Sequence, residues 1–297
     1  MHFTKMQGIG NDYVYVDCTK EAPADPSALA VAVSDRHFGI GSDGLILIKK
    51  SEIADFTMEM YNADGSRGKM CGNGIRCVGK YVYDHGLTDK TELTIETGAG
   101  LRELTLFPEN GKVRTVRVDM GPAIFSPAEI PVDPKYFANT SEDDGTVREV
   151  FFADFEVGGR TWLVFCVSMG NPHCVTFLDN RMAVEEFPLE KIGPLFEKHP
   201  AFPEGVNTEF AAIEDAHTIR MRVWERGSGE TWACGTGASA TAVAAIGAGW
   251  AMSPVRVRLN GGDLTIDWDG GSGHVFMTGP AEEVFSGEYE VSSCLDD

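Results

Sequence analysis

"CGNGIRCVG" at residues 71–79 and "CGTGASATA" at residues 234–242 are the two stretches that decide the fold of this chain. Each begins with a cysteine, places one polar residue between two glycines, and continues into an apolar stretch. Cys234 lies 163 residues after Cys71 in a chain of 297 residues. Two related segments that divide a chain in this way indicate an internal repeat.

Two further pairs of segments follow in the same order. Asn62 and Glu225 each end an apolar strand pattern, and each lies nine residues before its cysteine. The stretch "QGIGND" at 7–12 resembles "SMGNPH" at 168–173, with a Gly-Asn pair in common. Three matches in one order predict a duplicated domain, in which each copy supplies an asparagine turn, a polar strand end and a cysteine at a helix start. Two such copies facing each other would place the cysteines across a shared cleft.

The spacing of apolar residues predicts one main helix in each half, over 72 to about 85 and over 235 to about 247. Around each helix lie many short alternating stretches that are typical of strands. The segment "FFADFEVGGRTWLVFCVS" at 151–168 predicts a hairpin that turns at Gly158-Gly159. Residues 139–146 form a polar break without either periodicity. Short strands around one helix in each half predict the α+β class.

The composition argues against several classes of function. The formal net charge of −20 disfavours a nucleic acid or an anionic membrane as partner, because both require clustered Lys and Arg. The N-terminus lacks the basic and apolar regions of a secretory signal, and the most apolar window, 238–252, is too short and too interrupted to span a bilayer. Seven cysteines without tight disulfide spacing predict free thiols, so we expect a cytoplasmic protein.

The position of the two cysteines predicts acid–base chemistry. The first backbone N–H groups of a helix lack intrahelical partners and the helix dipole is positive there, so a thiolate or a substrate carboxylate is stabilised. We therefore expect the pKa of Cys71 and of Cys234 to lie below the free value of about 8.5. A thiolate on one face of a carbon can remove its hydrogen while a thiol on the opposite face delivers another, which epimerises that carbon. This reaction requires no cofactor.

The polar residues near these motifs suit a zwitterionic ligand. Asparagine can accept a hydrogen bond from an ammonium group and donate one to a carboxylate. Glu225-Arg226 adds an acceptor for a cation beside a bidentate donor to a carboxylate. The candidate asparagines, all at strand ends or glycine-rich turns, are Asn11, Asn62, Asn73, Asn171 and Asn207. A substrate with more than one amino-acid end would use all of them.

Six segments together resemble the diaminopimelate epimerase family: "GIGNDYVYVD", "FGIGSDGLILI", "YNADGSRGKMCGNGIRC", "GNPHCV", "FPEGVNTEF" and "WERGSGETWACGTGASA". The resemblance runs in order from residue 1 to about residue 285. It implies an isomerase that interconverts LL- and meso-2,6-diaminopimelate in lysine and peptidoglycan precursor biosynthesis, without pyridoxal phosphate or a metal.

The resemblance also implies roles for individual residues. Cys71 and Cys234 match the two catalytic cysteines, and His173 and Glu225 match residues that tune the pKa values of those cysteines. Gly44 departs from the pattern, because some family members carry a substrate-binding glutamine there. The family's substrate-binding positions are matched by Asn11, Asn62, Gly72, Asn73, Asn171, Asn207, Glu225, Arg226, Gly235 and Thr236.

The fold implied by the resemblance has two pseudo-symmetric lobes, each a barrel-like mixed or antiparallel sheet wrapped around a central helix. The last strands return to the N-terminal lobe, so the expected limits are 1–121 plus about 279–297 for the lobe with Cys71, and 122–278 for the lobe with Cys234. Family members are often homodimers, and we expect a homodimer with diaminopimelate as its small-molecule partner.

Alternative interpretations stay open for the same residues. The CGxG segments also occur in proline racemases and phenazine-type isomerases, so a proline or hydroxyproline racemase is one alternative, and a non-catalytic protein that binds small zwitterions is another. A zinc site is disfavoured, because Cys71 and Cys77 lie six residues apart and the C-x₂₋₄-C spacing is absent. An oxidised pair of thiols would be an inactivation route. The other cysteines are expected to be structural, since cysteine is among the most buried residue types: Cys18, Cys77, Cys166, Cys174 and Cys294.

Overall fold

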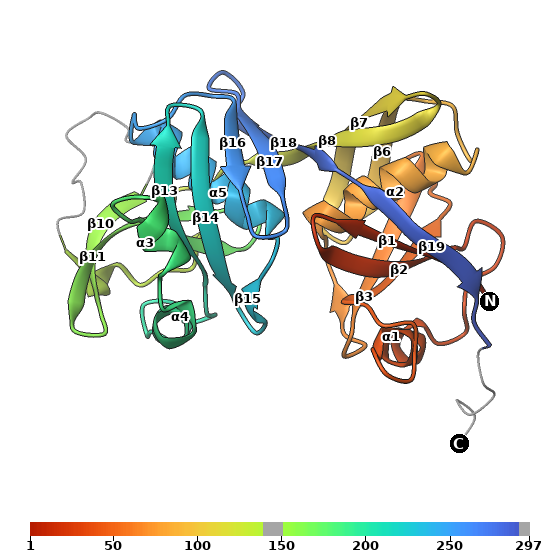
Figure 1. The fold of residues 1–297 in the computed structure, drawn as a ribbon, viewed down its shortest axis with the longest axis horizontal. Helices are drawn as coiled ribbons and strands as arrows, with labels where there is room; N and C mark the ends of the chain where they lie inside the picture. The colour runs from red at the N-terminus through yellow and green to blue at the C-terminus, as the bar shows by residue number, and fades with distance from the viewer. Residues whose placement is uncertain (139–150, 291–297) are drawn as a thin grey trace. The chain divides into compact units, whose positions relative to one another are not determined.

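The structure, a computed structural model, describes residues 1–138 and 151–290 and divides into two compact units (Figure 1). Unit 1 contains Met1–Asp119 and the segment from Thr278 onward, and unit 2 runs from Met120 to Met277. The expected lobe limits, at residues 121 and 279, lie close to these. The polar stretch at 139–146 and Cys294 lie outside the described residues. Among the described residues, many strands occur with two α-helices in unit 1 and three in unit 2, which confirms the α+β class.

Unit 1 is one mixed sheet with two helices. The strands pair in the order β19–β1–β2–β3–β4–β6–β7–β8, with β5 on β4; β2–β3 and β4–β6 are parallel and the other pairs antiparallel. The last strand therefore returns to the N-terminal unit, as the resemblance implied. The elements are β1 (His2–Gly8), β2 (Asn11–Asp17), α1 (Pro26–Ser34), β3 (Gly44–Lys49), β4 (Phe56–Asn62), β5 (Arg67–Gly68), α2 (Gly72–Asp84), β6 (Glu92–Thr97), β7 (Gly100–Glu109), β8 (Lys112–Pro122) and β19 (Glu282–Glu288).

Unit 2 is a second mixed sheet, paired in the order β9–β10–β11–β12–β13–β14–β16–β17 with β15 on β14. The short helices α3 and α4 were not expected from the apolar spacing. In the described ranges, each helix is too short or too polar to cross a membrane. The elements are η1 (Pro134–Tyr136), β9 (Phe137–Ala138), β10 (Phe151–Val157), β11 (Arg160–Ser168), β12 (Pro172–Phe177), α3 (Arg181–Glu185), α4 (Leu189–Glu197), β13 (Asn207–Asp215), β14 (Thr218–Glu225), β15 (Gly229–Thr231), α5 (Gly235–Gly247), β16 (Val255–Arg258), β17 (Asp263–Trp268) and β18 (His274–Pro280).

The two units repeat one ladder of strands. In unit 1, β1–β2–β3–β4–β6–β7 pair as antiparallel, parallel, antiparallel, parallel and antiparallel. In unit 2, β11–β12–β13–β14–β16–β17 pair in the same sequence of directions. The main helix of each unit follows a short strand paired with the fourth strand of the ladder: α2 begins at Gly72 after β5, and α5 begins at Gly235 after β15. The duplication predicted from the sequence is confirmed as a duplicated topology.

The main helices lie against several strands of their own sheets. Helix α2 contacts β1, β2, β7 and β19, and α5 contacts β11–β14, β16 and β17. Strand β3 shows why both faces of a sheet are apolar here: Leu45 and Leu47 pack with Leu29 of α1, while Ile46 on the opposite face approaches Gly74 of α2. A strand covered on both faces reads as a continuous apolar run, which is the "LILI" of this segment.

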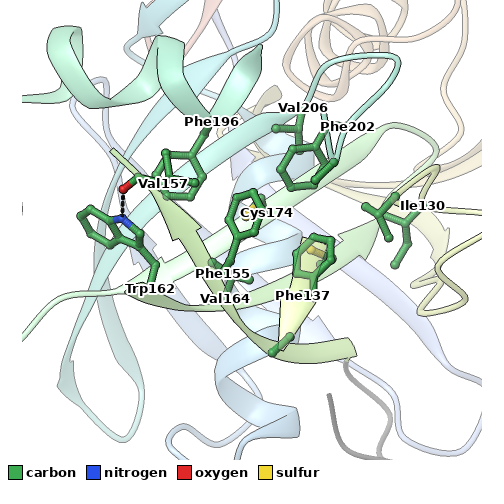
Figure 2. Packing of buried hydrophobic residues seen from close by; sticks show 14 of the residues in the cluster. Ile130, Phe137, Phe155, Val157, Trp162, Val164, Cys174, Phe196, Phe202 and Val206 are labelled. Carbon is green, nitrogen blue, oxygen red and sulfur yellow. Dashed lines mark hydrogen bonds between the residues drawn. The ribbon is translucent and has the colours of Figure 1, made fainter. Parts of the chain in front are cut away.

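Aromatic rings fill much of one core of unit 2 (Figure 2). Phe155 of β10 is fully buried, stacks on Phe137 with ring centroids 4.8 Å apart, and meets Phe196 and Phe202 edge to face. Figure 2 also shows Trp162 donating from its indole nitrogen to a backbone oxygen, at 3.1 Å. The four cysteines expected to be structural that fall in the described ranges, Cys18, Cys77, Cys166 and Cys174, are all buried, as expected.

We predict that Phe155→Ala destabilises the protein by about 3–5 kcal/mol, because it removes a ring that other rings enclose on several sides. Leu163→Ala on the neighbouring strand β11 is the matched control, since Leu163 is 37% exposed and its loss should cost about 1 kcal/mol or less. Chemical denaturation midpoints of the two variants measure the difference. Equal losses would contradict the aromatic cluster as the centre of this core.

Candidate active site

Cys71 is the N-cap residue of α2. Its backbone is extended (φ −134°, ψ 118°), and the helix begins at Gly72. The sulfur accepts the backbone N–H of Gly74 at 3.3 Å, which satisfies one of the donors that a helix start leaves unpaired. A Cβ on Gly74 would lie 2.7 Å from Ile46 Cδ1, so this glycine lets the helix start approach β3 closely.

Two asparagines surround the Cys71 sulfur in unit 1. The Cys71 thiol donates to Asn11 Oδ1 at 3.3 Å, and Asn73 Nδ2 donates to the same oxygen at 3.4 Å. Asn11 Nδ2 donates to Asp43 Oδ2 at 2.7 Å, which orients the amide so that its oxygen points toward Cys71. Asn73 accepts a bond from Arg76 Nη1 at 3.0 Å. The structure therefore brings the cysteine and both predicted asparagines into one hydrogen-bonded group.

Cys234 caps α5 in unit 2 by the same geometry. Its backbone is extended (φ −123°, ψ 106°), and the helix begins at Gly235. The sulfur accepts the backbone N–H of Gly237 at 3.4 Å and lies 3.5 Å from Thr236 Oγ1. Burial raises the pKa of Glu225, at the end of β14, and the neighbouring Thr231 hydroxyl and Cys234 thiol offset part of that rise. The structure therefore places Glu225 beside Cys234.

A buried carboxylate and imidazole lie beside the start of α5. His173 Nδ1 is 2.7 Å from Glu209 Oε1, and both side chains are fully buried. His173 Nε2 is 3.0 Å from Asn171 Oδ1, and Asn171 Nδ2 donates to Thr236 Oγ1 at 3.3 Å. A Cβ on Gly237 would lie 2.6 Å from Glu209 Oε1, so the glycine makes room for the carboxylate. His173 is therefore linked to the start of α5 by two neighbours: Glu209, which lies against Gly237, and Asn171, which donates to Thr236.

The other predicted ligand residues lie at strand ends and turns. Asn62 is exposed at the end of β4, and its Nδ2 donates to Ser66 Oγ at 2.9 Å. Asn207 is buried at the start of β13, and its Oδ1 accepts the backbone N–H of Arg226 at 2.9 Å. The Arg226 guanidinium is exposed and donates to the backbone oxygen of Glu204 at 2.8 Å. The contacts of these three side chains hold turns of their own units.

The expected fall in the cysteine pKa values is wrong for this structure. Burial raises the pKa of Cys71, and the backbone N–H groups at the start of α2 offset part of that rise. Burial raises the pKa of Cys234 well above its usual value, and the negative charges of Glu225 and Glu209 raise it further. The helix-start donors act on both sulfurs, but losing solvent around the thiolate has the larger effect.

Two residues next to the cysteines were not found by sequence reasoning. Glu209 is a carboxylate in the buried strand "NTEFAAIED", and a charged residue inside such an apolar strand was the available signal. Tyr13 is buried, and its hydroxyl offsets part of the rise that burial causes in the pKa of Cys71. Its signal was its place two residues after Asn11, on the same face of the strand.

Gly44 has no room for a side chain in this structure. A Cβ there would lie 2.1 Å from the Tyr61 backbone oxygen and 2.9 Å from Tyr13 Cε1. The position at which some family members carry glutamine is therefore closed by the backbone of β4 and by the ring of Tyr13.

We predict that Gly44→Ala destabilises the protein by about 1–3 kcal/mol, because the added methyl group must displace the backbone at Tyr61. Gly270→Ala is the matched control, since a Cβ at Gly270 meets nothing within 4 Å. Thermal or chemical unfolding of both variants measures the effect. An unchanged Gly44→Ala variant would show that position 44 accepts side chains.

We predict that Glu225→Gln lowers the pKa of Cys234, because it removes a negative charge that disfavours the thiolate. Alkylation of Cys234 by iodoacetamide at pH 8 should become about three- to tenfold faster, measured by mass spectrometry of its peptide. The control is Glu230→Gln, since Glu230 instead pairs with Arg222 at 2.7 Å. A slower or unchanged rate in Glu225→Gln, with the Glu230 control also unchanged, would contradict this electrostatic assignment.

The chain matches the family model for diaminopimelate epimerase over residues 3–126 and 165–284. A diaminopimelate epimerase from Agathobacter rectalis is 56% identical over 291 residues, covering 98% of this chain and all of that protein. Diaminopimelate epimerases from Acetivibrio thermocellus and Methanococcus maripaludis are 51% and 52% identical, each over 98% of this chain and at least 99% of the relative.

Solved structures of other proteins have the same fold. A phenazine biosynthesis protein of the PhzF family from Bacillus anthracis superposes with a TM-score of 0.68 at 18% identity, covering 98% of this chain and 99% of that chain. A probable proline racemase from Agrobacterium radiobacter superposes with a TM-score of 0.64 at 15% identity, covering 98% and 93%. These similarities to solved structures show the fold, whereas the full-length relatives with 51–56% identity show the family. This chain belongs to the diaminopimelate epimerase family.

Proposed function

We propose that this chain interconverts LL- and meso-2,6-diaminopimelate, with Cys71 and Cys234 as its two acid–base groups. The observation that carries the proposal is the repeated device: in each unit a cysteine caps a helix that begins with glycine, and its sulfur accepts a backbone N–H of the first turn. The full-length relatives named diaminopimelate epimerase support the choice of substrate.

In this proposal the helix starts hold the carboxylate of the reacting centre. The segments Gly72-Asn73 and Gly235-Thr236 open the two helices, where backbone N–H groups have no partner within the helix. These donors would also stabilise the negative charge that develops when the α-proton leaves, which is the main chemical difficulty of the reaction.

The remaining polar groups would bind the ammonium and carboxylate groups of both ends of the substrate. Asn11 and Asn171 adjoin the two cysteine groups, while Asn62, Asn207 and Arg226 lie at neighbouring turns. Binding would replace the contacts that these side chains make with the turns.

The proposed proton transfers use the two sulfurs in turn. One cysteine, as thiolate, takes the α-proton, and the electron pair of the broken C–H bond stays on the substrate carbon. The other cysteine, as thiol, then gives its proton to the opposite face, so the first sulfur ends as thiol and the second as thiolate. The total charge on the two sulfurs is unchanged, and no redox partner is needed.

His173 and Glu225 would set the protonation of the unit 2 sulfur. Glu225 lies beside the thiol, and His173 binds the second nearby carboxylate, Glu209. The homodimer, the cytoplasmic location and a reaction without metal or cofactor stay predictions from the sequence and the family resemblance.

The experiment is to add LL-diaminopimelate to the purified, reduced protein and to follow formation of the meso isomer. Cys71→Ala and Cys234→Ala should each lower turnover at least about 10²- to 10⁴-fold in both directions, because each turnover requires one base and one acid. Cys18→Ala is the control for loss of a thiol, since Cys18 lies in the core of unit 1 that packs against α1.

Near-normal turnover by either catalytic variant would contradict the two-base scheme. Turnover of L-proline in place of diaminopimelate would favour the racemase alternative. Binding of diaminopimelate by the wild-type protein without any turnover would favour the zwitterion-binding alternative.

A further inference from the structure

One face of β2 is directed at the first turn of α2. Alternate residues of a strand share a face, and Asn11, Tyr13 and Tyr15 are such a set. Asn11 accepts the Cys71 thiol at 3.3 Å, and the Tyr15 hydroxyl donates to the backbone oxygen of Gly74 at 3.2 Å. Tyr13 lies between these two contacts, which places its ring beside the start of the helix.

Gly44 fixes the position of the Tyr13 ring. Strands β2 and β3 are parallel with Val14 opposite Leu45, so Tyr13 lies beside Gly44. A Cβ on Gly44 would approach Tyr13 Cε1 to 2.9 Å, which means that the ring occupies the space a side chain would take. Tyr13 is 5% exposed, so the ring has little freedom to leave this place.

Cys71 and Asn11 are the polar side chains beside the Tyr13 hydroxyl. Burial and the nearby negative charges of Cys71 and Asp43 raise the pKa of Tyr13 well above its usual value, so the hydroxyl keeps its proton and acts as a donor. The same contact, together with the N–H groups at the helix start, lowers the pKa of Cys71 against the effect of burial. A donor at this place favours the charged form of the sulfur.

Unit 2 has a different residue at the equivalent position. In its ladder His173 lies opposite Asn207, the residue that corresponds to Gly44 by the 163-residue spacing. The His173 ring binds Glu209 and Asn171, and the thiol of Cys234 meets a carboxyl group. The two sulfurs therefore have opposite surroundings: a hydroxyl group that can donate in unit 1, and negatively charged carboxylates that accept hydrogen bonds in unit 2.

We propose that Tyr13 is a positioning residue for Cys71, whose hydroxyl donates a hydrogen bond to the sulfur and holds its thiolate form at the start of α2. The role in catalysis rests on the proposed function, whereas the effect on the sulfur does not. Gly44 belongs to the same device, because it leaves the space in which the Tyr13 ring lies.

The test compares the wild-type protein with Tyr13→Phe, which removes only the hydroxyl and keeps the ring. Alkylation of Cys71 by iodoacetamide is followed across pH by mass spectrometry of its peptide. In Tyr13→Phe the midpoint should rise by about one pH unit, so alkylation at pH 7 should slow by about tenfold. Tyr61→Phe is the matched control, since the Tyr61 hydroxyl donates to Glu59 at 2.9 Å.

A Tyr13→Phe midpoint equal to that of the wild type would overturn the proposal, as would an equal shift in Tyr61→Phe. This readout decides the effect on the sulfur whether or not the chain epimerises diaminopimelate. In an active enzyme the acid limb of kcat/KM should move to higher pH by the same amount in Tyr13→Phe. If the alkylation midpoint shifts but the acid limb of kcat/KM keeps its wild-type pH, the role of Tyr13 in catalysis is contradicted.

Discussion

The contact between a cysteine sulfur and the backbone N–H of the third residue of a helix is the interaction on which both candidate groups depend. It requires a residue without a side chain at that N–H, because a Cβ on Gly74 would meet Ile46 and one on Gly237 would meet Glu209. The glycines therefore allow the helix start to lie deep in each unit, against a buried strand. The same burial opposes the helix-start donors by disfavouring the thiolate. The protonation state of each sulfur therefore depends on the few polar groups that lie beside it.

Those polar groups are where the two copies have diverged. The strand ladders, the helix starts and the extended cap residues are alike in the two units. The neighbours of the sulfurs differ, with a tyrosine hydroxyl in unit 1 and a glutamate carboxyl in unit 2. A reaction that needs one acid and one base benefits from two similar groups with different protonation. Duplication supplies the similarity, and substitutions at single positions on the strands supply the difference.

The sequence predicted the features that depend on local pattern and failed on those that depend on burial. The paired CGxG segments and the spacing of apolar residues predicted the duplication and the main helices α2 and α5. Helices α3 and α4 were missed because they have only five and nine residues, too few turns for a helical spacing of apolar residues to be recognised. The predicted direction of the pKa shift of Cys71 and Cys234 was wrong, because the sequence shows the helix start but not the loss of solvent around the sulfur. Glu209 and Tyr13 were missed because their importance lies in which side chains they meet across strands.

Two acid–base groups acting on opposite faces of one carbon are the central claim, and the position of solvent hydrogen tests it most directly. LL-diaminopimelate is incubated with the reduced protein in D₂O, and both isomers are examined by NMR at low conversion. The two-thiol account predicts deuterium at the inverted carbon of the meso product and almost none in the recovered LL substrate, because the proton removed and the proton delivered reside on different sulfurs. Meso product that retains the original hydrogen, or LL substrate that acquires deuterium as fast as product forms, would contradict it.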